Sequence, residues 1–126
     1  SIEVKNVKNV EGNGDYVGVK LGNVHGNISI THDYGSLKID RLAPDAGNVE
    51  IRTAYTGVKI GYDRQYYFDF EITTEYAGVS GKDDFEINVR KEKSTEKYYL
   101  GYYGKANSGH RVNVTSEYGG ITFDKN

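Results

Sequence analysis

The sequence predicts an all-β fold: a single-domain β-solenoid with coils of about 21 residues, for which an antiparallel β-sandwich or roll is the alternative. Two observations predict it. Four segments, beginning at residues 28, 49, 70 and 112, share one pattern: alternating apolar residues, a polar stretch, a tyrosine, two small or polar residues and another apolar residue. Apolar and polar residues alternate with a period of two, which is typical of strands with one buried face, and no window has a helical period.

Positions one period apart carry similar side chains, as in-register stacking of parallel strands would produce. One aliphatic column comprises Ile30, Ile51, Ile72 and Val114. A second comprises Leu37, Val58, Val79, Leu100 and Ile121. We therefore expect Val79 to contact Val58 on one side and Leu100 on the other. A weaker copy at 15–21, which contains Tyr16, Val19 and Leu21, brings the expected number of coils to five.

Each coil is expected to consist of two short strands joined at a tight corner. The corners carry tyrosines, which we expect to form a structural ladder on one edge: Tyr34, Tyr55, Tyr76 and Tyr118. Glycines follow them closely and would permit a sharp bend or a left-handed backbone: Gly35, Gly57, Gly78 and Gly120. A looser polar connection, such as residues 41–48, leads to the next coil.

Residues 85–107 do not follow the repeat. They contain an alternating strand with Phe85, Ile87 and Val89, a charged stretch from Arg90 to Lys97, and a strand rich in tyrosine. We expect an irregular insertion here, a loop or hairpin that protrudes from the domain, which otherwise spans residues 1–126. Insertions in repeat arrays often carry function.

Composition excludes several functional classes. Sixteen Lys and Arg residues against eighteen Asp and Glu residues give a net charge of −2, so the chain has no excess of positive charge that would attract nucleic acid. The sequence contains no run of 18 or more apolar residues, which a membrane-spanning helix would need. The absence of cysteine excludes thiol chemistry. His25, His32 and His110 lack metal-ligand spacing, so we expect neither a metal site nor a cofactor.

The Tyr-x-Gly copies and the segment 97–123, KYYLGYYGKANSGHRVNVTSEYGGITF, resemble the autotransporter-adhesin-like families of bacterial envelope proteins, whose domains are of unknown function. The resemblance covers residues 25–123. It implies a right-handed β-helix and an extracytoplasmic location: periplasmic, anchored to the outer membrane or on the cell surface. It also implies that the chain is a fragment of a longer exported protein, because it begins abruptly at Ser1 without an initiating methionine.

We expect a non-enzymatic surface module that binds a glycan or a surface protein, through one face of the solenoid or through loop 90–97. Its candidate binding residues form a second tyrosine cluster: Tyr62, Tyr66, Tyr67, Tyr98, Tyr99, Tyr102 and Tyr103. Arg64, Lys97 and Lys105 would form a cationic rim. Packing beneath the insertion is the alternative for this cluster.

Two other functions stay open. The first is a self-assembling scaffold, a homo-oligomer formed by stacking through the coil ends. The second is a carbohydrate-active β-helix enzyme, for which carboxylates such as Glu50, Glu71 and Glu86 would have to converge. The segments 11–15 (EGNGD) and 82–84 (KDD) could touch calcium, but each also suits a simple turn.

Overall fold

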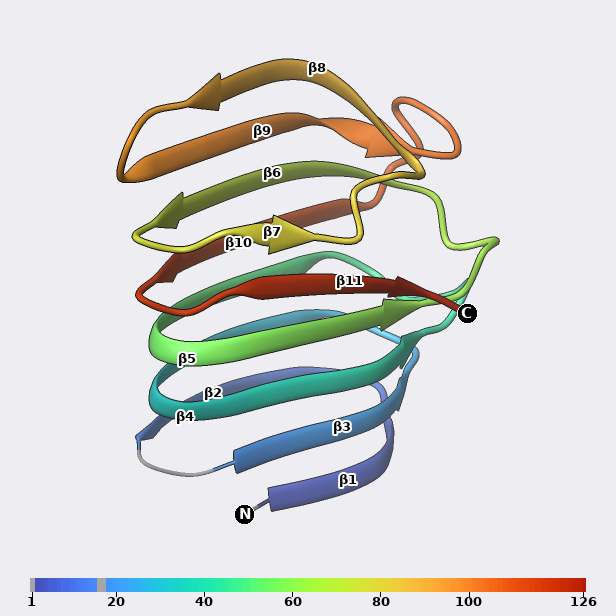
Figure 1. Cartoon of the computed structure of the whole chain (residues 1–126). Helices are drawn as coiled ribbons and strands as arrows, with labels where there is room; N and C mark the ends of the chain where they lie inside the picture. Colours follow the sequence, from blue (N-terminus) through green and yellow to red (C-terminus); the bar gives the residue numbers. More distant parts are fainter. Residues whose placement is uncertain (1, 16–17) are drawn as a thin grey trace.

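The computed structural model describes residues 2–15 and 18–126, and this part of the chain is all-β, without any helix. Its strands all belong to one sheet (Figure 1). The strands are β1 (Ile2–Val7), β2 (Val10–Asp15), β3 (Gly18–Val24), β4 (Ile28–Leu42), β5 (Val49–Tyr62), β6 (Phe68–Glu75), β7 (Val79–Ser80), β8 (Phe85–Glu92), β9 (Glu96–Tyr103), β10 (Arg111–Glu117) and β11 (Ile121–Lys125).

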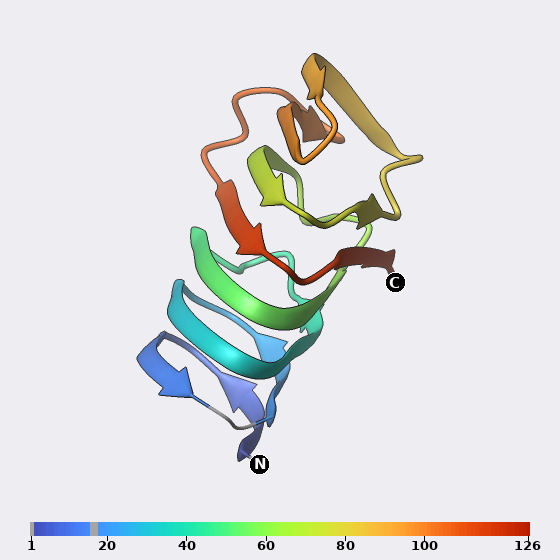
Figure 2. The same cartoon turned by 60° about the vertical axis from the view of Figure 1, so that its left-hand side comes forward.

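The sheet bends at the tyrosine corners, so that two walls face each other across the core (Figures 1 and 2). The long strands β4 and β5 run through a corner and contribute to both walls. The front wall of Figure 1 has the order β1, β3, β4, β5, β11, β7, and all its pairs are parallel. The rear wall has the order β2, β4, β5, β10, β6, β9, β8, in which β6–β9 and β8–β9 are antiparallel.

Between β4 and β5 the parallel register follows the sequence spacing. Ile30 pairs with Ile51, and Leu37 pairs with Val58, an offset of 21 residues in both cases. The weaker copy also pairs as its spacing predicts, because Val19 lies beside Leu37. The Tyr16 of that copy lies outside the described residues.

The order of the segments in space differs from their order in the sequence. Residues 111–125, which we call the inserted rung, lie between residues 49–62 and residues 68–80 on both walls. On the rear wall Val112 pairs with both Val49 and Phe70. On the front wall Ile121 lies between Val58 and Val79. The expectation that Val79 contacts Val58 as its neighbour in the column is therefore wrong.

Leu100 does not belong to the aliphatic column either. It lies on β9, where it is opposite Glu71 of β6 and Val89 of β8. The strands β8 and β9 form an antiparallel hairpin that continues the rear wall beyond β6, which is the form that the irregular insertion 85–107 takes. Leu100 is therefore on the rear wall and Val79 on the front wall, and β9 pairs antiparallel with its neighbours, so the 21-residue spacing does not place the two residues side by side.

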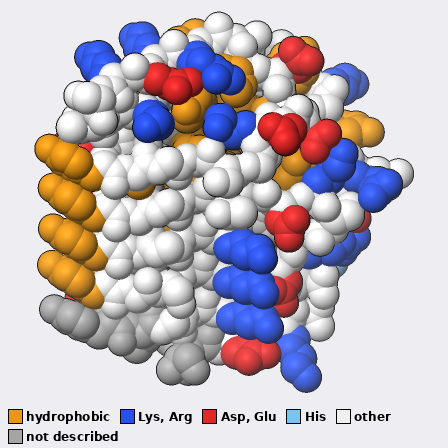
Figure 3. Space-filling view, viewed as in Figure 1, with side chains coloured by type: hydrophobic (Ala, Val, Ile, Leu, Met, Phe, Trp, Pro, Cys, Tyr) orange, Lys and Arg blue, Asp and Glu red, His pale blue; other side chains and the backbone are white. Residues whose placement is uncertain are grey.

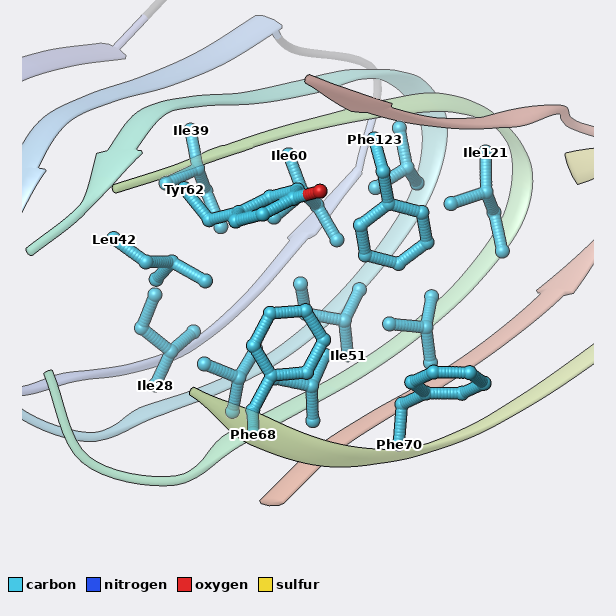
Figure 4. Packing of buried hydrophobic residues seen from close by; sticks show 14 of the residues in the cluster. Ile28, Ile39, Leu42, Ile51, Ile60, Tyr62, Phe68, Phe70, Ile121 and Phe123 are labelled. Carbon is cyan, nitrogen blue, oxygen red and sulfur yellow. The ribbon is translucent and has the colours of Figure 1, made fainter. Parts of the chain in front are cut away.

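The walls enclose one apolar core that runs along the stack (Figure 4). Aliphatic residues fill the part between β3, β4 and β5, where Ile39, Ile51 and Ile60 are at most 1% exposed. Aromatic residues fill the part beneath the hairpin, where the ring of Phe68 packs edge-on against those of Tyr62 and Phe85. The change from aliphatic to aromatic packing accompanies the change from parallel to antiparallel pairing.

The corners have an unusual backbone. The residues with positive φ are the tyrosines themselves, with φ between 52° and 58°, and not the glycines that follow them. Buried hydroxyl groups support two of these bends: Thr74 Oγ1 donates to the Ala77 carbonyl at 2.9 Å, and Ser116 Oγ donates to the Gly119 carbonyl at 2.6 Å. These bonds span the left-handed residue and satisfy carbonyls that no strand pairs.

The opposite corner carries a ladder of asparagines, which the repeated apolar and tyrosine positions do not predict. Asn9 Oδ1 accepts the backbone N–H of Asn27 at 2.9 Å, and Asn27 Oδ1 accepts that of Asn48 at 2.8 Å. Each amide thus ties one segment to the next where the strands are interrupted. The signal was present in the sequence, because each asparagine directly precedes the first apolar residue of a segment.

Candidate binding face

Four of the seven tyrosines proposed for binding lie in the core. Tyr62, Tyr66, Tyr99 and Tyr103 are between 0% and 8% exposed, which corrects the expectation of an accessible aromatic strip at these positions. Along β9 the side chains alternate, so Tyr99 and Tyr103 point inward while Tyr98 and Tyr102 are partly exposed. The packing alternative therefore describes these four residues better.

Two of the buried phenols are hydrogen-bonded to backbone carbonyls. Tyr66 donates to Gly47 at 2.6 Å, and Tyr103 donates to Arg64 at 2.8 Å. Desolvation on burial raises the pKa of Tyr66, and it is also the main cause that raises the pKa of Tyr62. These side chains hold the loop 63–67 against the core and present no surface to a ligand.

Of the remaining three tyrosines, Tyr98 and Tyr102 share the outer face of β9, whereas Tyr67 directly precedes β6. Tyr98 donates to Glu71 Oε2 at 2.8 Å on the outer face of β9, a bond that raises its pKa. Tyr67 is 40% exposed, and its ring lies 6.1 Å from that of the buried Tyr103. The rim residue Arg64 donates to the carbonyl of Asn126 at 3.2 Å.

The corner tyrosines form an exposed ridge along one edge of the molecule (Figure 3). In spatial order they are Tyr34, Tyr55, Tyr118 and Tyr76, each 48% to 54% exposed. Adjacent rings are 4.8–4.9 Å apart and within 7° of parallel. The faces between neighbouring rings are covered, so along its length the ridge offers ring edges and hydroxyl groups and not the flat faces on which a sugar would stack. The ladder is thus a stacking element of the corner.

A column of lysines lies on the same front wall. Lys20 pairs with Lys38, and Lys38 pairs with Lys59, on the parallel strands β3, β4 and β5. Figure 3 shows these basic side chains as a vertical run over the middle of the front wall. Strand neighbours are about 4.8 Å apart. Three like charges at this spacing repel one another and destabilise the fold.

Shallow depressions accompany the lysine column on its side away from the ridge. One, of about 360 Å³, is lined by Lys20, Gly22 and Asn23 among others, and a second, of about 250 Å³, by Lys38, Lys59 and Gly61 among others. A glycine lines each of them, and neither position accepts a side chain without a shift of the backbone: a Cβ at Gly22 would lie 2.1 Å from the Lys5 carbonyl, and one at Gly61 would lie 2.0 Å from the Asp40 carbonyl.

The lysine column is only partly neutralised. Lys38 Nζ lies 3.7 Å from Asp40 Oδ1, and no ion pair joins Lys20 or Lys59 to a carboxylate among the described residues. Carboxylates border the column as well, because Glu3 is the register partner of Lys20 and Asp40 lines both depressions. The tip of the β8–β9 hairpin also mixes its charges: Arg90 pairs with Glu92 at 3.0 Å, and Lys91 and Lys93 share a depression of about 260 Å³ with Glu96.

Two of the carboxylates considered for catalysis have side-chain partners. Glu50 lies 3.5 Å from Arg52, and Glu71 accepts the hydroxyl of Tyr98. Asp84 of the segment 82–84 pairs with Lys125 at 3.1 Å. Within residues 2–15 and 18–126 no group of three or more His, Asp or Glu side chains could hold a metal ion.

The described part of the chain has no helix with the length and apolar character needed to cross a membrane. Comparisons of the chain with protein-family models, with curated proteins and with solved structures found no match.

Proposed function

We propose that this chain is a non-enzymatic binding module that holds an extended anionic glycan along the lysine column Lys20, Lys38 and Lys59. The observation that carries the proposal is the in-register stacking of these lysines on three neighbouring strands. Such a column costs stability and contributes nothing to the core, and a row of carboxylate or sulfate groups would neutralise it.

An extended polymer suits this face better than a compact ligand. The lysine ammonium groups follow one another along the stack, and the depressions beside Gly22 and Gly61 follow the same line. A polymer with regularly spaced anionic groups could contact several lysines at once, which raises the overall affinity without any single strong contact. Asp40 and Asp124, which border the second depression, could accept hydrogen bonds from sugar hydroxyl groups.

The proposal includes the finer features of the fold and the biological setting. We propose that the parallel part of the sheet is a right-handed β-solenoid. We also propose that the module belongs to a longer exported protein and works outside the cytoplasm as an adhesin. The parallel register at an offset of 21 residues supports the solenoid. The sequence resemblance supports the location and the adhesive role.

The test measures binding of the chain to polygalacturonate and heparin, with dextran as a neutral polymer, by titration calorimetry at low and moderate salt. The test variant is K20Q/K38Q/K59Q, and the matched control is K91Q/K93Q/K97Q at the hairpin tip, which removes the same charge. We expect binding to an anionic polymer that weakens with salt and is lost several-fold only in the column variant.

Each contrary outcome has a clear meaning. Loss only in the hairpin variant would move the site to loop 90–97 and overturn the proposal. Equal losses in both variants would indicate attraction to net charge alone and would also overturn it, as would equal binding to dextran.

A further inference from the structure

The inserted rung is held on both sides by partners that come earlier in the sequence. On the rear wall β10 pairs with β5 and β6, and on the front wall β11 pairs with β5 and β7. The ring of Tyr118 stacks between those of Tyr55 and Tyr76. Val112, Val114 and Ile121 are at most 1% exposed. The rest of the molecule therefore forms a slot, one strand wide, into which residues 111–125 fit.

One short connection joins this rung to the rest of the described chain. Residues 104–110 run from β9 to β10, and three of them, Gly104, Asn107 and Gly109, have positive φ. Its contacts gather at Asn107 and His110. The Asn107 N–H donates to Asp69 Oδ1 at 3.1 Å, the His110 carbonyl accepts the Asp69 N–H at 2.9 Å, and the His110 ring stacks on that of Tyr66. A connection that contains two glycines can adopt other conformations at low cost.

The slot does not depend on which copy of the chain fills it. Every contact of the inserted rung with β5, β6 and β7 would form equally with the rung of another molecule, as in domain swapping. An unfilled slot would expose the edges of β5 and β6 and the apolar faces beside them, which favours capture of a strand.

We propose that residues 111–125 are an exchangeable element, and that in a second copy of this chain they occupy the same slot between β5 and β6–β7. When two copies exchange residues 111–125 with each other, the product is a strand-exchanged dimer. When the segment of each copy fills the slot of the next copy, the product is a linear oligomer. At low protein concentration each chain fills its own slot, because the connection gives its own rung a high effective concentration there. The inference does not depend on the glycan proposal.

The test uses disulfide trapping in the full chain, which contains no cysteine of its own. Glu50 of β5 and Asn113 of β10 are register partners on neighbouring parallel strands. Their Cα atoms are about 5 Å apart, within the range that a disulfide requires. The control position is Ser29 of β4, which pairs with Glu50 on its other side and lies about 10 Å from β10, too far for a disulfide.

Chains carrying E50C are mixed with chains carrying N113C in urea, and the mixture is refolded at high protein concentration and then oxidised. Mass spectrometry identifies the disulfide-linked peptides. We expect several-fold more of the 50–113 linkage between different chains than of the 29–113 linkage in a parallel mixture of S29C and N113C. Equal yields would mean random collision and would overturn the proposal.

A double variant, E50C/N113C, monitors folding of the substituted chain. Refolded at low concentration, it should form the 50–113 disulfide within one molecule. If it does so while the mixed single variants give no excess of the linkage, the inserted rung does not exchange. If it fails to link, the rung does not lie beside β5 and the proposal loses its basis.

Discussion

Asn48 Oδ1 accepts the backbone N–H of Arg111 at 3.0 Å across a sequence separation of 63 residues. This bond continues the asparagine ladder from residues 27 and 48 into the inserted rung and skips residues 68–80, which follow sooner in the sequence. It shows that the ladder follows the spatial order of the segments. One amide thus links the first half of the chain to its end region.

Replacement of Asn48 by alanine should loosen the start of β10. The lost hydrogen bond leaves the N–H of Arg111 to water, and we expect a loss of about 1 kcal/mol in the free energy of unfolding. Hydrogen exchange should accelerate at residues 111 and 112. The control is Asn88→Ala on the exposed side of β8, which should change stability by less than about 0.5 kcal/mol. Unchanged exchange at these amides would mean that the ladder does not hold the rung.

Substitution of Ile121 should be among the most destabilising changes on the front wall. Ile121 is 1% exposed and has an aliphatic neighbour on each side, whereas Val79 is 8% exposed on the two-residue strand β7. Ile121→Ala should cost about 2–5 kcal/mol. Urea denaturation should show a smaller loss for Val79→Ala and almost none for the exposed Thr122→Ala or Glu75→Ala. A larger loss at Val79 than at Ile121 would contradict the spatial order described above.

The corner tyrosines should invert the usual order of alanine and glycine. Tyr55 has φ of 52° and stacks on Tyr34 and Tyr118, so Tyr55→Ala loses two ring contacts worth about 0.5–1.5 kcal/mol each. Glycine loses the same contacts but accepts a left-handed backbone without strain. We therefore expect Tyr55→Gly to melt at a higher temperature than Tyr55→Ala. At Lys59, on the same strand but without positive φ, alanine should be the more stable of the two.

Alkaline pH should unfold the protein through its buried phenols. Burial raises the pKa of Tyr66 above its ordinary value of about 10, so the unfolded chain releases this proton first. The stability is present in full below about pH 10 and falls as the pH rises through and above this value. Tyr66→Phe should reduce this loss, although it also removes the hydrogen bond to Gly47. Tyrosinate absorbance measures the ionisation of the phenols, and circular dichroism measures the unfolding. The control Tyr67→Phe, at an exposed site, should behave like the wild type.

The sequence was informative where strands follow the repeat in parallel. The column of Leu37 and Val58, and the stacking of Tyr34 on Tyr55, could be predicted from a constant spacing, because parallel strands in register place equivalent residues side by side. The position of the left-handed residue was less predictable. Glycine usually occupies such a site, because other residues disfavour a left-handed backbone. Here tyrosine occupies it, and its ring stacks on the rings of the neighbouring corners.

The spatial order of the segments could not be read from the sequence. Val112 fits between Val49 and Phe70 as well as it would fit beyond Phe70, because a uniform apolar column carries no information on order. The tyrosines of β9 were misleading for a related reason. Their spacing does not reveal which alternate residues face the core, and Tyr99 and Tyr103 proved to be inside. The lysine column was visible as a spacing, but its exposure on one wall required the fold.

The position of the inserted rung has a consequence for how the protein is made. During synthesis residues 49–62 and 68–80 leave the ribosome before residues 111–125, so the middle of the stack stays open until a late segment arrives. A nascent or truncated chain that lacks this segment carries two unpaired strand edges and an unfilled core, which are the features that chaperones and proteases recognise. The late closure thus distinguishes chains in which residues 111–125 have docked from chains in which they have not.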